Sequence, residues 1–139
     1  MPETATQADW LTARLTLLKA EKDLQRQRDA LAAQRRALPW VQVDKAYTFD
    51  TPTGQQSLAD LFADKSQLIV QHFMMGPDWD AGCTSCSFMA DSLNGNTAHL
   101  AARDAAFVAV SNTPLQKIEA YKSRMGWDFS WVSSMGSDF

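Results

Sequence analysis

The chain of 139 residues is long enough for one domain, or for a small domain with an appendage, and its 45% of apolar residues is ordinary for a packed core. A net charge of −3 lacks the basic excess that nucleic-acid-binding proteins usually carry. Because the apolar runs are too short to span a bilayer and the N-terminus lacks a secretory signal, we expect a cytoplasmic protein that binds neither nucleic acid nor membrane.

Residues 6–38 predict one long helix, because the segment contains no glycine or proline and Pro39 follows it. The positions that would complete a coiled-coil seam hold alanine, glutamine or charged residues. We therefore favour an amphipathic helix packed on its own domain or on a sister subunit over an extended zipper. Large apolar residues recur every seven positions along this helix: Trp10, Leu17, Leu24, Leu31 and Leu38.

The pattern changes after Pro39, so we expect an N-terminal helix at residues 1–39 and a second domain at residues 40–139. Residues 40–54 alternate and indicate a strand or hairpin that enters a turn at residues 52–54. Residues 57–62 predict a helical turn with Ser57 as its N-cap. The apolar run at residues 66–75 predicts a buried strand, and residues 76–82 predict a loop.

The remaining chain alternates helices and strands. Residues 87–104 are helical except near 94–96, and residues 105–112 predict a second buried strand. Thr113 as N-cap, Pro114 at the first helical position and Gly126 after the end mark the next helix. Residues 127–134 predict a third strand. The alternation requires right-handed crossovers between partly parallel strands, so the predicted class is α/β.

Both cysteines of the chain, Cys83 and Cys86, lie in "GCTSC", directly after the predicted loop and at the start of a helix. In the cytoplasm a lasting structural disulfide is uncommon, and a close pair more often performs redox or metal chemistry. The amides and dipole of a helix N-terminus favour a thiolate. We therefore expect Cys83 to be the nucleophile, opposed electrostatically by Asp78 and Asp80.

Cys86 should lie one turn into the helix, more buried, with its amide committed to the first turn, and should act as the resolving thiol. The alternative is that both cysteines only pack the core. Zinc is a third possibility, with His99 as a further ligand. However, Arg103 occupies the place of the fourth ligand, for which only His72 could substitute. We therefore expect neither a metal nor a cofactor.

The segment "YTFDTPTGQQSLADLFADKSQLIVQHFM" resembles the opening of peroxiredoxins and other thioredoxin-fold proteins, in which a hairpin and a helical turn precede the strand that delivers the active-site cysteine. The segments "SQLIVQHFMMGPDWDAGCTSCSF" and "FVAVSNTPLQKIEAYKSRMGW" resemble more closely a bacterial thioredoxin-like family without an assigned function, domain of unknown function 899. This resemblance extends over nearly the whole chain. It implies a thioredoxin-like fold and a dithiol at Cys83 and Cys86, but no substrate.

Two departures limit what the resemblance implies. Peroxiredoxins resemble one another in a threonine or serine three residues before the attacking cysteine, where this chain has Asp80, so peroxidase activity is not expected. A thioredoxin fold also needs a further strand, a closing helix and a cis-proline loop, yet no proline follows Pro114. We therefore expect the thioredoxin-like βαβ core of residues 40–139 to be truncated at its C-terminus.

Two functions follow from these residues. The first is a thiol–disulfide oxidoreductase whose CxxC dithiol, Cys83 and Cys86, acts on a protein or small-molecule disulfide. The second is a non-catalytic thioredoxin-fold interaction module that associates through its N-terminal helix. In either case we expect a homo-oligomer, held by that helix or by an unpaired edge of the sheet.

Overall fold

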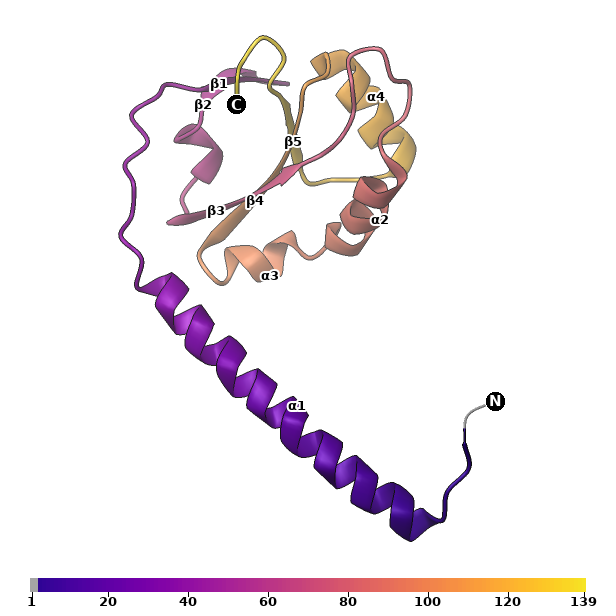
Figure 1. Cartoon of the computed structure of the whole chain (residues 1–139). Coiled ribbons are helices and arrows are strands. Elements are labelled where there is room, and N and C mark those ends of the chain that lie inside the picture. The colour runs from indigo at the N-terminus through magenta and orange to yellow at the C-terminus, as the bar shows by residue number, and fades with distance from the viewer. Residues whose placement is uncertain (1–2) are drawn as a thin grey trace. The chain divides into compact units, whose positions relative to one another are not determined.

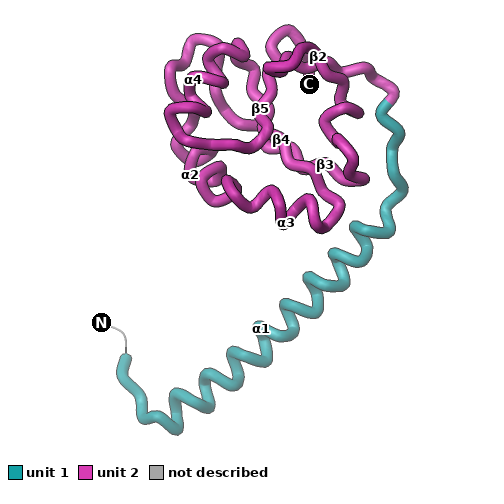
Figure 2. The backbone as a smooth tube through the Cα atoms, turned by 180° about the vertical axis from the view of Figure 1, so that it is seen from behind, with its two compact units in different colours: residues 1–43 teal, residues 44–139 magenta. Residues whose placement is uncertain are grey.

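The computed structural model describes residues 3–139, which fall into two compact units separated between Val43 and Asp44 (Figure 2). The first unit contains one helix, α1 (Gln7–Arg36) (Figure 1). Thr6 caps it, since its hydroxyl oxygen accepts a hydrogen bond from the amide of Asp9 at 3.2 Å. The predicted helix is therefore confirmed, and within its own unit none of its residues is buried.

The second unit is a five-stranded mixed sheet with helices, which confirms the predicted α/β class. The strands lie in the order β2-β1-β5-β4-β3. The last three are parallel to one another, and β1 is antiparallel to both β2 and β5. The elements are β1 (Thr48–Thr51), β2 (Gly54–Ser57), the 3-10 helix η1 (Asp60–Phe62), β3 (Gln67–His72), α2 (Thr84–Leu93), α3 (Thr97–Ala101), β4 (Ala105–Ser111), α4 (Leu115–Met125) and β5 (Ser130–Ser133).

Two hydrophobic clusters cover the two faces of this sheet. Successive residues of a strand point to opposite faces, so Phe107 of β4 joins one cluster and Val108 joins the other. The first, here called the aromatic cluster, packs against α2 through Ala90 and against α4 through Ile118. Its rings are Phe73, Phe107, Tyr121, Trp127, Phe129 and Trp131. The second, here called the aliphatic cluster, includes Leu61 of η1. Its other buried members are Phe49, Val108, Val110 and Val132. Because both faces of β4 are covered, the prediction of a buried strand at residues 105–112 is confirmed.

The other predicted buried strand, β3, is not buried. It lies at the edge of the sheet and pairs only with β4, and its Ile69 is exposed. The apolar residues that do enter the core, Phe73 and Met75, come just after the strand ends. An apolar run in the sequence indicates that a strand forms. Whether the strand is buried depends on how many neighbouring strands and helices pack against it.

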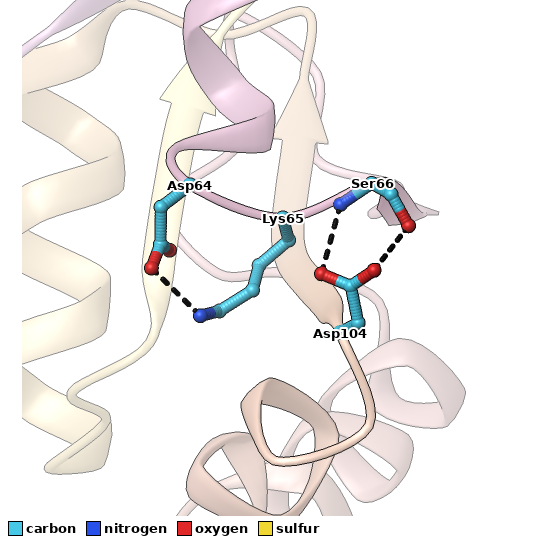
Figure 3. A network of polar contacts seen from close by, with 4 residues as sticks. All are labelled: Asp64, Lys65, Ser66 and Asp104. Carbon is cyan, nitrogen blue, oxygen red and sulfur yellow. Dashed lines mark hydrogen bonds and ion pairs between the residues drawn. The ribbon is translucent and has the colours of Figure 1, made fainter.

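Polar side chains fix the N-terminal end of β3, as Figure 3 shows. Asp104, which has a left-handed backbone with φ of 59°, accepts hydrogen bonds from the amide of Ser66 at 3.1 Å and from its hydroxyl. These bonds lower the pKa of Asp104. The amide of Gln67 adds a bond to the carbonyl of Asp104 at 3.2 Å. The start of β3 is thereby aligned with β4, which sets the parallel register.

The start of α4 differs from the prediction. The N-cap is Pro114, not Thr113, because the hydroxyl of Thr113 is fully buried and donates to the carbonyl of Met75. That contact ties the chain after β4 to the chain after β3. The end of α4 follows the prediction, since Gly126 adopts φ of 72° and terminates the helix.

Candidate dithiol site

The cysteines lie between the C-terminal end of β3 and the first turn of α2, as the sequence predicts. The amide of Cys83 donates to the carbonyl of Met74 at 2.9 Å, which closes the loop between them. Gly82, the residue before Cys83, packs closely against two rings. A Cβ atom at this position would lie 2.4 Å from Cε1 of Phe73 and 3.0 Å from Cε1 of Tyr121. Only glycine allows this close approach, and its fit against two buried rings fixes where Cys83 stands.

Cys83 is the N-cap residue of α2, with φ of −55° and ψ of 134°. Its pKa is lowered, first by the backbone amides of Cys86 and Ser85 and further by the side chains of the same two residues. Partial desolvation opposes these bonds but is outweighed. The helix N-terminus therefore favours the thiolate of Cys83, in the direction that the sequence argument gives.

Cys86 departs from the expectation in one respect. The first amide that bonds within α2 belongs to Ser87, which donates to the carbonyl of Cys83 at 2.9 Å. The amide of Cys86 is thus not committed to the helix, and it lowers the pKa of Cys83. Both thiols are free and both are half-buried, but Cys86 packs against the aromatic cluster. Gln71 of β3 donates to the carbonyl of Cys86 at 3.2 Å and holds this turn against the sheet.

Asp80, one of the two acids of the loop, lies close to a cation. Lys117 of α4 places its ammonium 3.5 Å from a carboxylate oxygen of Asp80 and also approaches the carbonyl of Trp79 at 3.4 Å. The Asp80 side chain is almost fully exposed, so water and salt screen its charge. Lys117 therefore offsets part of the charge of Asp80, one of the two acids that the sequence places near Cys83.

Tyr121 of α4 is a site residue that the sequence argument missed. It is buried, and its hydroxyl lies 3.0 Å from Oγ of Ser87, which donates in turn to the carbonyl of Cys83 at 2.9 Å. A cavity of about 190 Å³ opens beside Tyr121. The residues of α4 that line it are three or four positions apart, and this helical spacing could have indicated in the sequence that they share one face. The cavity is lined by Met75, Trp79, Asp80, Lys117, Ala120, Tyr121 and Arg124.

The alternative zinc ligands are not brought together. Within residues 3–139 no group of three histidine, cysteine or acidic side chains is placed to share a metal ion. His72 instead stacks on Phe139, with ring centroids 5.3 Å apart, and His99 lies on the short helix α3. Among the helices described, none combines the length and apolarity needed to cross a membrane.

Comparison with known proteins gives one match. The family model described as "Bacterial protein of unknown function (DUF899)" matches residues 1–139. No curated protein and no solved structure matches the chain. The match supports the resemblance to this bacterial family that the sequence motifs indicate, and it brings no substrate, cofactor or partner with it.

Proposed function

Since the chain belongs to the bacterial family of unknown function DUF899, we propose its function from its own residues: a cytoplasmic, thioredoxin-like thiol–disulfide oxidoreductase with Cys83 as nucleophile and Cys86 as resolving thiol. The observation that carries the proposal is the position of Cys83 as the N-cap residue of α2, with Cys86 in the first turn and a lowered pKa for Cys83. The amides of Ser85 and Cys86 and the thiol of Cys86 all favour the Cys83 thiolate. A thiolate, not a thiol, attacks disulfides.

The proposed reaction has two exchange steps. The Cys83 thiolate attacks one sulfur of a substrate disulfide, a Cys83–substrate disulfide forms, and the second substrate sulfur leaves as a thiolate. Cys86 then loses its proton to water and attacks the Cys83 sulfur, which releases the first substrate sulfur. The products are a Cys83–Cys86 disulfide and two substrate thiols, so two electrons pass from the protein to the substrate. An external dithiol must reduce the protein again.

The two-residue spacing supports the second step, because it places Cys86 within one helical turn of Cys83 at the start of α2. Cys86→Ser should therefore form a long-lived mixed disulfide with oxidised glutathione, whereas the wild-type protein should resolve it. Mass spectrometry of the intact protein measures both species. A mixed disulfide of equal lifetime in the wild-type protein and in Cys86→Ser would contradict the assigned role of Cys86.

A second proposal concerns assembly. The apolar stripe of α1 remains exposed and recurs every seven residues, with Ala13, Ala20, Gln27 and Gln34 between its members. We propose that this stripe packs against the same stripe of a second, parallel copy as an amphipathic contact and not as an extended zipper, because alanine and glutamine fill the intervening positions. The charges beside the stripe select the orientation: in a parallel pair Asp9 faces Arg14, and Asp23 faces Arg28. An antiparallel pair would instead place Arg14 against Arg28 and Glu21 against its own copy.

Two leucines of α1 provide a matched test of this assembly. Leu17 lies in the stripe and Leu15 on the opposite face, and their exposed fractions are 55% and 56%. Leu17→Glu should weaken the dimer by about a hundredfold, because each copy loses a buried leucine. Leu15→Glu should leave the dimer intact. Light scattering at micromolar concentration measures the mass, and a single-chain mass for the wild-type protein would refute the proposal.

A further inference from the structure

The cavity beside Tyr121 carries two cationic side chains from one face of α4. Lys117 and Arg124 are seven residues apart, which is two helical turns, and both line the cavity. Ala120 lies between them, and its small side chain leaves room. The opposite wall is Trp79, in the loop that leads to Cys83. The cavity therefore combines positive charge with apolar walls, directly beside the dithiol loop.

Arg124 is held in a defined position. Its guanidinium carbon lies 4.7 Å from the centroid of the Tyr121 ring, a cation–π contact. Within residues 3–139 its partner is this ring and not a carboxylate. A guanidinium that rests on an aromatic face keeps its N–H groups available and loses little conformational freedom when it binds. Since the one acid of the cavity, Asp80, pairs with Lys117, the positive charge of Arg124 is left without a counterion there.

The cavity is also coupled to the nucleophile through direct contacts. Tyr121 forms its inner wall and supports Gly82, the residue before Cys83. The hydroxyl of Tyr121 bonds to Ser87, which bonds to the carbonyl of Cys83. A small molecule seated against Tyr121 would therefore have the dithiol loop as its other neighbour.

We infer that this cavity binds an anionic group of the substrate, so that the preferred substrates are small disulfides that carry a carboxylate near the sulfur–sulfur bond. The inference rests on the proposed oxidoreductase function. Arg124 supplies a fork of donors that matches both oxygens of a carboxylate, and its charge is the one that no acid of the cavity offsets, since Lys117 pairs with Asp80. A volume of about 190 Å³, below the roughly 300–1,000 Å³ of most ligand pockets, admits one small acidic group rather than a folded protein segment.

Two chromogenic disulfides separate recognition from reactivity. Dithiobis(nitrobenzoate) carries a carboxylate on each ring, whereas dipyridyl disulfide is uncharged at neutral pH. Loss of a cation near Cys83 changes its thiolate fraction and affects both reactions alike, so the ratio of the two rate constants reports recognition alone. The reduced protein is mixed with each disulfide at low ionic strength, and the absorbance of the released thiol gives each rate constant.

Arg124→Gln should lower the rate ratio of anionic to neutral disulfide about fivefold, the upper range for one exposed ion pair. Lys122→Gln removes the same charge from the same helix but outside the cavity, and it should leave the ratio unchanged. Fast reaction with both disulfides and an equal ratio in both variants would overturn this inference and leave the oxidoreductase proposal intact. If neither disulfide reacts until the protein is unfolded, the oxidoreductase proposal fails and the inference fails with it.

Discussion

Cys83→Ser will abolish the fast alkylation of the folded protein by iodoacetamide at neutral pH, whereas Cys86→Ser will retain it. The physical reason is the lowered pKa of Cys83, whose two largest causes are backbone amides that remain in Cys86→Ser. A lowered pKa means that the thiolate persists to lower pH. The alkylation rate of the folded protein should therefore reach half its maximum at a lower pH than that of the denatured protein.

Peptide mass spectrometry after a short alkylation pulse identifies which cysteine has reacted and at what rate. Denatured protein is the control, because both thiols should then react with the ordinary dependence on pH. Faster modification of Cys86 than of Cys83 in the folded protein would reverse the assigned roles. Thiols that remain unreactive until denaturation would instead indicate that both cysteines serve only to pack the core.

Gly82→Ala should destabilise the protein and disturb the dithiol together. The added methyl group would lie 2.4 Å from the ring of Phe73 and 3.0 Å from that of Tyr121, both buried in the aromatic cluster. Overpacking of this kind costs about 1–3 kcal/mol of unfolding free energy. Relief of the clash requires the loop to move, and Cys83 moves with it. The reaction of Cys83 with iodoacetamide should consequently slow.

Gly76→Ala provides the control for that substitution. Its added methyl group would meet only the ring of Trp79, at 3.1 Å, and this ring is partly exposed and free to shift. Neither glycine has a positive φ, so backbone strain does not separate the two variants. Urea denaturation measures the unfolding free energy of each. Equal stability of Gly82→Ala and Gly76→Ala would show that the fit of Gly82 against the core rings is not what positions the loop.

Local sequence patterns account for much of this fold and fail where long-range packing decides. The apolar runs of β3 and β4 look alike in sequence, yet only β4 acquires two strand neighbours and covered faces. Thr113 is a residue type that often caps helices, but its hydroxyl donates a hydrogen bond to the carbonyl of Met75, 38 residues earlier. The hydrogen-bond partner of a polar side chain depends on how the helices pack on the sheet. A short stretch of sequence does not show this packing.

The same division applies to the site. Cys83 could be placed at the start of α2 because the loop, the cysteine spacing and the helix are contiguous in sequence. Tyr121 and Arg124 could not be associated with it, because α4 reaches the dithiol loop only by packing on the sheet face that α2 also covers. The role of the Cys86 amide was also missed, since the sequence argument assigned this amide to the first turn of the helix, whereas the first amides of a helix have no partner within it.

Equilibration of the protein with a graded series of reduced and oxidised glutathione tests the central claim most directly. The account predicts that Cys83 and Cys86 oxidise together in one two-electron transition, at a potential within the range of known dithiol enzymes, about −120 to −270 mV. Cys83→Ser and Cys86→Ser should each lack this transition. Thiols that stay reduced across the whole series, or that oxidise independently of each other, would contradict the claim that this dithiol transfers electrons.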